Sequence, residues 1–363
     1  MKTLKNILIL SIPSVLILLL MLELFFRFII PASEQPNGYF DSNDKIYVYS
    51  NELEKGLYTK GKFAEIKSKW RINNMGWNYP IDYYRVENKK LIAVIGDSYV
   101  EAFQVDADKN YPYLLREKLG KHYEVFAFGM SGAPLSQYLH ISRYVNKHLN
   151  PEVLIFNVVH NDFNESILEL FPEVDYFLQV SIKENGSVRE TIPQPNYSFA
   201  QYSPLKRLLY RSAFVRYLWS NLKVNNTVKD FFKNNEDQYE SNIKVTDVIE
   251  NRGKIIKATD YLIKTIHKEN RDKRIIFIFD APRKAIYNNS LNESNVRWLN
   301  EMMEASCKKY SVGYIDLTQL IQKDYKANNI KFNSEFDYHW NEYGHEFVAS
   351  VLHEYLRNNK TID

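Results

Sequence analysis

Short apolar runs alternate with amphipathic stretches along most of the chain from Leu91 onward. The runs read "LIAVI", "YEVFAF", "VLIFNVV", "RIIFIF" and "VGYIDL", and helix-like spacing of apolar residues occurs near 111–119, 135–148, 248–269, 293–310 and 342–357. Continuously apolar strands that alternate with helices are typical of a parallel sheet covered on both faces. The pattern therefore predicts a three-layer α/β domain over residues 91–360.

The beginning of the chain follows a different pattern, because Ile7 to Ile30 contains only two charged residues, Glu23 and Arg27. As a helix this stretch would be about 36 Å long, enough to cross a hydrocarbon core of about 30 Å. Lysines precede it and acidic residues follow it, so the positive-inside rule places the N-terminus in the cytoplasm and the rest in the periplasm or outside the cell. We expect residues 1–30 to be a retained single-pass transmembrane anchor. A cleaved signal peptide is the alternative, but no small-x-small cleavage site precedes Pro31.

Two other stretches do not follow the strand-helix alternation. Residues 31–90 are irregular and rich in turn formers, which predicts a neck between the anchor and the α/β domain. Residues 163–247 form a long insert, and within it "SPLKRLLYRSAFVRYLWSNL" carries an apolar stripe beside basic residues. This stretch is either a helix packed on the core with a solvated basic face, or a lid or membrane-surface helix beside the active site.

Composition and charge exclude some classes of function. The net charge of +3 comes from 47 basic and 44 acidic residues spread along the chain, so nothing indicates a nucleic-acid partner. A single cysteine, Cys307, rules out an intramolecular disulfide and a multi-cysteine metal site. Its place in a predicted helix, without a paired base, indicates a structural role.

Candidate catalytic residues follow the predicted strands. In open α/β sheets, ligands bind at the carboxyl ends of the strands. There the chain places "GDS" with Ser98, "FGMSGAP" with Gly129, "HND" with Asn161 and, after the last strand, "FDYHWNEYGHEF" with His339.

A serine hydroxyl needs an adjacent base, which His339 can supply. The backbone N–H groups of Ser98 and Gly129 and the side-chain amide of Asn161 could form an oxyanion hole. These parts suffice for acyl transfer.

These four residues, in this order, resemble the blocks of the SGNH hydrolases, also called GDSL hydrolases, and the similarity extends roughly from Leu91 to Leu356 with the insert unmatched. The resemblance implies a flavodoxin-like α/β/α sandwich, a nucleophilic Ser98 and no metal or organic cofactor. With the preceding membrane segment, "HWNEYGH" looks like the anchored, exported members of that family. Some of those members deacetylate or transfer acetyl groups on cell-surface polysaccharides.

The acid of the predicted triad departs from the family pattern. The family usually has an aspartate three residues before the histidine, but that position here is Phe336. Asp337 lies two residues before His339, a spacing similar to some polysaccharide O-acetylation relatives. We therefore expect Asp337 to be the triad acid, with Glu335 as the reserve candidate.

The function that we expect is a serine esterase that forms a covalent acyl-serine intermediate on an ester, with O-acetyl groups of a cell-surface polysaccharide as the candidate substrate. An O-acyltransferase would use the same mechanism. Two hypotheses from other classes are an inactive module of this fold that binds a surface glycan or a partner protein, and a phosphoryl-transfer or metal site built on Asp97 and Asp162.

Overall fold

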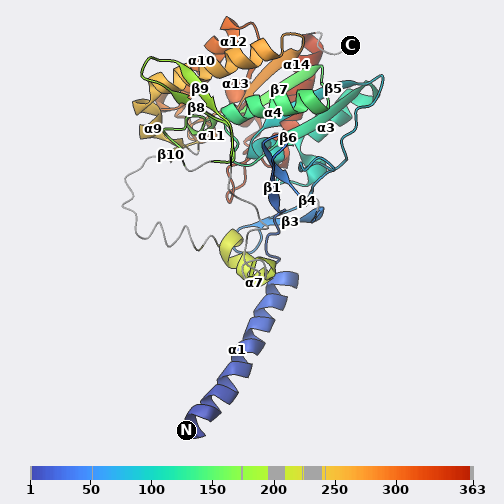
Figure 1. Ribbon diagram of the computed structural model, residues 1–363, viewed down its shortest axis with the longest axis vertical. Coiled ribbons are helices and arrows are strands. Elements are labelled where there is room, and N and C mark those ends of the chain that lie inside the picture. The colour runs from blue at the N-terminus through green and yellow to red at the C-terminus, as the bar shows by residue number, and fades with distance from the viewer. Residues whose placement is uncertain are drawn as a thin grey trace.

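A five-stranded parallel sheet forms the centre of the molecule (Figure 1). The computed structural model describes residues 2–359 apart from 51, 173–174, 195–208, 223, 225–238 and 242. In sheet order the strands are β13 (Gly313–Asp316), β12 (Arg274–Phe279), β7 (Val153–Val158), β5 (Lys90–Gly96) and β6 (Tyr123–Gly129). Numbered by their order along the chain, these strands run 2-1-3-4-5 from the β6 edge, which is the doubly wound order of flavodoxin-like folds. The predicted fold class is confirmed, and all five apolar runs form its strands.

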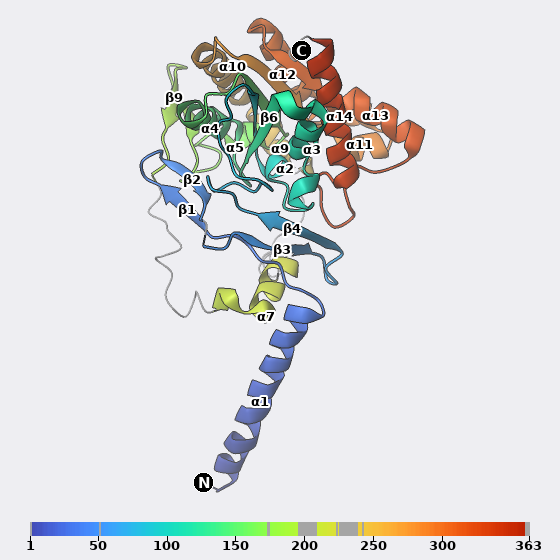
Figure 2. The same cartoon turned by 90° about the vertical axis from the view of Figure 1, so that its right-hand side faces the viewer.

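Helices cover both faces of this sheet (Figures 1 and 2). One face carries α3 (Tyr111–Leu119) and α14 (Glu342–Asn358), and the other carries α4 (Leu135–His148), α10 (Arg252–Glu269) and α12 (Arg297–Lys309). The strand side chains between these layers are almost wholly inaccessible to solvent. Because each strand is covered on both faces, it needs a continuous apolar run, and this explains the pattern in the sequence.

The helices differ most from the expected ones at two places. The helical pattern near 248–269 is two helices, α9 (Val245–Glu250) and α10, because the chain bends at Asn251. A helix that the pattern did not indicate, α13 (Leu317–Asn328), begins directly after β13. The Asp316 side chain accepts a hydrogen bond from the Thr318 N–H and so caps its first turn.

Residues 31–90 are more ordered than the expected neck. They contain two antiparallel hairpins, β1 (Gly38–Asp41) with β2 (Ile46–Tyr49) and β3 (Lys55–Lys60) with β4 (Ile66–Arg71). The chain then lies along the edge strand β6, where the hydroxyls of Tyr79 and Tyr83 donate to the carbonyls of Val125 and Ala127 at 2.5 and 2.6 Å. These hydrogen bonds give partners to two backbone carbonyls of β6 that, at the edge of the sheet, have no neighbouring strand to bond.

The insert between β7 and α9 adds a hairpin and a short helical segment. The hairpin is β8 (Gln179–Ile182) with β9 (Val188–Thr191), and the segment comprises α7 (Ala213–Arg216) and a single π-helical turn, Tyr217–Asn221. Residues 203–208 of the expected amphipathic stretch lie outside the described residues. The described part, 209–222, packs beside the end of the N-terminal helix rather than on the central sheet (Figure 2).

The N-terminal helix α1 (Lys2–Phe28) projects away from the rest of the molecule (Figure 1). Its span Ile9–Phe28 is long and apolar enough to cross a membrane, and none of that span is buried. A helix with these properties at the N-terminus is either a signal sequence or a membrane anchor.

Candidate active site

Ser98 stands at the sharp turn between β5 and the short helix α2 (Ser98–Glu101). The Asp97 carboxylate accepts a hydrogen bond from the Tyr99 N–H at 2.9 Å and caps this helix. Gly129, which pairs with Gly96 in the sheet, allows α2 to lie close to the end of β6, because a Cβ atom at Gly129 would come within 2.1 Å of the Glu101 backbone nitrogen. The turn therefore needs a residue without a side chain at Gly129.

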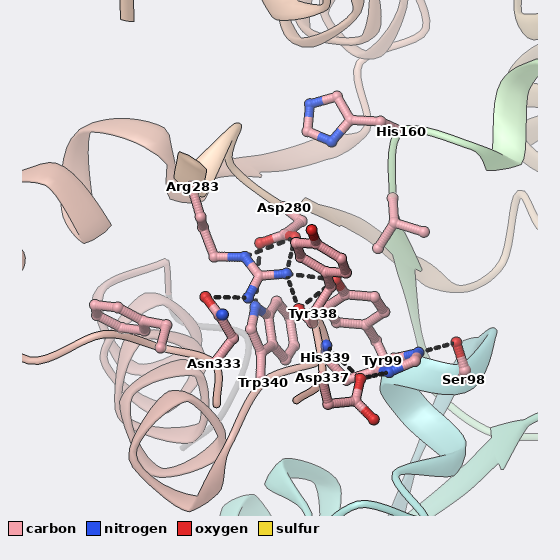
Figure 3. A network of polar contacts seen from close by, with 12 residues as sticks. Ser98, Tyr99, His160, Asp280, Arg283, Asn333, Asp337, Tyr338, His339 and Trp340 are labelled. Atoms are coloured by element: carbon pink, nitrogen blue, oxygen red, sulfur yellow. Dashed lines mark hydrogen bonds and ion pairs between the residues drawn. The ribbon is translucent and has the colours of Figure 1, made fainter. Parts of the chain in front are cut away.

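His339 and Asp337 continue a hydrogen-bonded chain from Ser98 (Figure 3). Nε2 of His339 lies 2.7 Å from Oγ of Ser98, and Nδ1 of His339 lies 2.5 Å from Oδ1 of Asp337. The same Asp337 oxygen accepts the His339 backbone N–H at 3.0 Å, so the two-residue spacing lets the carboxylate fold back onto its own loop. Glu335, the reserve candidate, is exposed.

The second oxygen of Asp337 is bound from the β3–β4 hairpin. Nζ of Lys60 lies 2.8 Å from Oδ2 of Asp337, and the hydroxyl of Tyr58 lies 3.5 Å from it. The Asp337 side chain is only 2% exposed. Burial by itself raises the pKa of Asp337, but the hydrogen bond from His339 and the positive charges of His339 and Lys60 hold that pKa well below its usual value. Sequence reasoning missed Lys60, because no motif surrounds it.

A buried ion pair at the end of β12 holds both neighbours of His339 (Figure 3). Arg283 pairs with Asp280 at 3.2 Å and donates to the backbone carbonyl of Tyr338 at 2.5 Å. Asp280 in turn accepts the indole N–H of Trp340 at 3.1 Å. The imidazole is thus flanked by two fixed residues, and this network was also not anticipated from the sequence.

The expected oxyanion donors lie on the strand ends that flank β5. Gly129 ends β6, and Asn161 lies just beyond β7 and before the short helix α5 (Asp162–Glu165). The Asn161 side chain hydrogen-bonds the Glu165 carboxylate; burial raises the pKa of Glu165 to about 7, and this bond opposes the rise. The contacts described for Asn161 do not include one to Ser98. Asn161 instead lines a separate cavity of about 810 Å³ that it shares with Arg283 and Tyr338.

A cleft of about 610 Å³ opens beside Ser98 and His339. Its lining combines aromatic and polar side chains from the two N-terminal hairpins, α2 and the residues that follow it, the loop after β6, and the insert: Tyr47, Tyr49, Tyr58, Phe103, Trp219, Lys60, Glu101, Gln104 and Ser131. Glu101 is buried and accepts a hydrogen bond from the Tyr49 hydroxyl at 2.6 Å and another from the Ser131 hydroxyl. Burial raises the pKa of Glu101 to about 7 although these bonds oppose the rise.

The carboxylates of the hypothetical metal site are engaged by the protein itself. Asp97 caps α2, while Asp162 is fully buried and accepts the Tyr138 hydroxyl and the Val159 N–H, both at 2.8 Å. Within the described ranges, no group of three or more His, Cys, Asp or Glu side chains is arranged to hold a metal ion. Cys307 is buried in α12, and burial raises the pKa of its thiol to about 12.

A doubly wound parallel sheet with a hydrogen-bonded serine and histidine near its carboxyl edge places the chain in a class of α/β proteins whose site is suited to acyl transfer. Within that class, the model of the GDSL-like lipase/acylhydrolase family matches residues 94–347. The chain belongs to this family, which confirms the resemblance seen in the sequence. It is therefore an esterase or acylhydrolase of carboxylic esters, and its substrate is an ester.

Solved structures with a similar fold cover most of this chain. The aryl esterase of M. smegmatis is 12% identical over 74% of this chain and 99% of its own, with a TM-score of 0.34. The acetyl xylan esterase AlAXEase is 13% identical over 73% of this chain and 99% of its own, with a TM-score of 0.40. A lipolytic G-D-S-L family member from Veillonella parvula is 12% identical over 73% of this chain and 97% of its own, with a TM-score of 0.38. A comparison with curated proteins gave no match.

Proposed function

We propose that the chain is a serine esterase in which Ser98 is the nucleophile, His339 the general base and Asp337 the residue that orients His339. The observation that carries the proposal is the continuous hydrogen-bonded chain from Ser98 Oγ through His339 to Asp337. Ser98 passes its proton to Nε2 of His339 as Oγ bonds to the ester carbonyl carbon. The C–O bond then breaks, the alcohol leaves with that proton, and water releases the acyl group by the reverse steps.

The negative charge on the carbonyl oxygen is stabilised by the backbone N–H groups of Ser98 and Gly129 and by the amide of Asn161. The Asn161 carboxamide has two N–H donors, so one can bond Glu165 and leave the other available to bond the oxyanion. Removing one donor from such a site typically slows the reaction by about 100- to 1000-fold.

The substrate that we propose is an O-acylated saccharide, with acetyl as the acyl group. The faces of Tyr47 and Tyr58 offer flat apolar surface for sugar rings, and the Gln104 carboxamide offers a hydrogen-bond partner for sugar hydroxyls. If a sugar hydroxyl replaces water in the second step, the same residues perform acyl transfer. Analysis of the products distinguishes the two outcomes.

The proposal includes a retained α1 anchor, with the catalytic residues in the periplasm or outside the cell. The last turns of α1 are bonded to the folded insert: the Glu23 carboxylate accepts hydrogen bonds from the Ser212 hydroxyl and from the Ala213 and Phe214 N–H groups at 2.7–3.1 Å. The Phe26 ring stacks on Tyr217 with centroids 3.9 Å apart. Cleavage after α1 would remove these partners, which favours an anchor over a signal peptide.

The first test is covalent labelling of the full chain in detergent with a small fluorophosphonate, read by intact mass. We expect one adduct on the parent protein and on Ser220→Ala, a control serine that lines the same cleft, and none on Ser98→Ala. An adduct that persists in Ser98→Ala, or no adduct on the folded parent, contradicts the proposal. The second outcome would favour an inactive binding module.

A further inference from the structure

Exposed apolar side chains gather where α1 meets the rest of the molecule. Phe63, at the tip of the β3–β4 hairpin, is 74% exposed, and Leu209, Tyr210 and Trp219 in the insert are 46%, 39% and 52% exposed. We call these four residues the juxtamembrane surface. Large apolar side chains in such a group mark an interaction site.

A series of contacts fixes this surface to the last turns of α1. Phe26 of α1 stacks on Tyr217, and the Tyr217 hydroxyl donates to the Lys62 carbonyl at 2.8 Å, next to Phe63 in the chain. Figure 2 shows α7 beside the end of α1, with β3 and β4 directly above it. If α1 spans a bilayer up to Phe28, the juxtamembrane surface therefore lies at the level of the lipid headgroups.

The composition of this region fits a lipid interface better than a protein partner. The exposed cations Arg27, Lys62 and Arg211 accompany the aromatic residues. Aromatic rings beside basic side chains are typical of segments that lie at the boundary between headgroups and acyl chains. The surface is also continuous with an apolar helix of which no residue in the span Ile9–Phe28 is buried, and this continuity identifies the bilayer as the occupant.

The same surface borders the catalytic cleft. Trp219 and Ser220 line the cleft together with Ser98, and Asn221 donates to Thr59 Oγ1 at 3.0 Å, next to Lys60. Segment 209–222 thus connects the end of α1 to the edge of the cleft.

We propose that the juxtamembrane surface docks on the lipid bilayer and holds the mouth of the cleft at the bilayer surface, so that Ser98 receives esters carried there by a lipid or lipid-linked molecule. This inference rests on the proposed function and on a retained anchor, and it narrows the substrate to amphiphilic esters. A freely diffusing polysaccharide would not require such a surface.

Tryptophan fluorescence tests the docking directly, because α1 contains no tryptophan. Of the five tryptophans, Trp70, Trp77 and Trp340 are buried, and Trp298 lies on α12. The full chain is reconstituted in phosphatidylcholine–phosphatidylglycerol vesicles with or without brominated acyl chains. We expect bromine to quench part of the emission, and Trp219→Phe to lose that quenched part. Equal quenching in the two proteins, or no quenching in the parent, overturns the proposal.

A kinetic test separates this proposal from the catalytic one. The rate of Ser98 labelling is compared for a water-soluble fluorophosphonate and for one with a long alkyl chain held in vesicles. Phe63 is outside the cleft lining, so Phe63→Ser should lower the rate with the alkyl probe roughly tenfold and leave the soluble probe unaffected. Tyr84→Ser, a matched change at a side chain 65% exposed, should alter neither rate.

The two proposals fail in different ways. If the protein shows the Trp219-dependent quenching but neither probe labels it, the docking proposal is supported and Ser98 is not the nucleophile. If both probes label Phe63→Ser as fast as they label the parent, Ser98 is supported as the nucleophile. The proposed role of the juxtamembrane surface is then overturned.

Discussion

Asp337 is shared between an imidazole and an ammonium group, each of which binds one of its two oxygens. One of its oxygens bonds the His339 ring and the other bonds Lys60, so each acceptor has a charged or polar partner although the side chain is buried. An unpaired buried carboxylate would be costly, and Lys60 removes much of that cost. In the proposed mechanism, Lys60 of β3 therefore supports the orientation of the His339 imidazole.

Replacing Lys60 with methionine should alter the pH dependence of the reaction. Without the ammonium group, the Asp337 charge acts on His339 alone and favours the protonated, inactive imidazolium. The acid limb of the kcat/KM profile should then move to higher pH by roughly one unit. Asp97 also interacts electrostatically with His339, and it does not change in this variant.

Two variants serve as controls for this prediction. Lys60→Arg keeps the charge and should restore most of the profile, and Lys62→Met removes an exposed lysine from the same hairpin tip and should leave the profile unchanged. A uniform loss of rate with an unshifted acid limb would mean that Lys60 serves only the folding of the hairpin.

At the scale of elements, the position of Ser98, the proposed nucleophile, depends on how closely α2 approaches β6. The contact is backbone against backbone, since a Cβ at Gly129 would meet the Glu101 nitrogen and the Val100 carbonyl carbon at 2.1 and 2.5 Å. Backbone atoms cannot move aside as a flexible side chain can. A substituent at Gly129 must therefore push α2, and Ser98 with it, away from the sheet.

Gly129→Ala should consequently slow Ser98 labelling by at least about 100-fold and lower the stability of the protein by roughly 1–3 kcal/mol. Gly253→Ala is the matched control, because nothing lies within 4 Å of a Cβ at that position in α10. In a helix the same change should be neutral or stabilising by up to about 1 kcal/mol. Labelling rates and thermal unfolding of both variants provide the measurement, and equal effects at the two glycines would contradict the packing argument.

For the whole molecule, the decisive feature is that α1, the insert, the β3–β4 hairpin and the cleft are linked in one series of contacts. Glu23 holds the start of α7, Tyr217 holds the hairpin tip, and Lys60 of that hairpin holds Asp337. The N-terminal part of the chain thus contributes to the site although it lies outside the family match at residues 94–347.

If α1 is retained as an anchor, the mature protein should still contain it and remain in the membrane. The chain extracted from membranes should have the intact mass of a protein that includes residues 2–30, and alkaline carbonate should not release it. The double variant Leu16→Arg, Leu19→Arg introduces two charges into the apolar span and should appear in the soluble fraction. A parent protein that begins near residue 31 would show that α1 is a cleaved signal sequence.

Local patterns in the sequence determined the central sheet, most of its helices and the strand ends near which Ser98, Gly129 and Asn161 lie. His339 instead lies in the loop between α13 and α14. Burial on both faces of a parallel sheet is visible in the sequence, because each strand must be apolar throughout. The order of the four motifs that contain these residues, together with the apolar strand pattern, was enough to identify the family. The sequence signal of helix α13 is weaker, and the sequence analysis missed this helix because its amphipathic pattern follows β13 without an intervening loop.

Only the tertiary structure decided which carboxylate meets His339, what binds the second oxygen of that carboxylate, and what borders the cleft. Asp337 and Glu335 are both close to His339 in sequence, and the fold of the loop selects between them. Lys60 is 277 positions from Asp337, and Ser212 is 189 positions from Glu23. Contacts over such separations impose no periodicity on the sequence near either partner, so a single sequence carries no local signal of them.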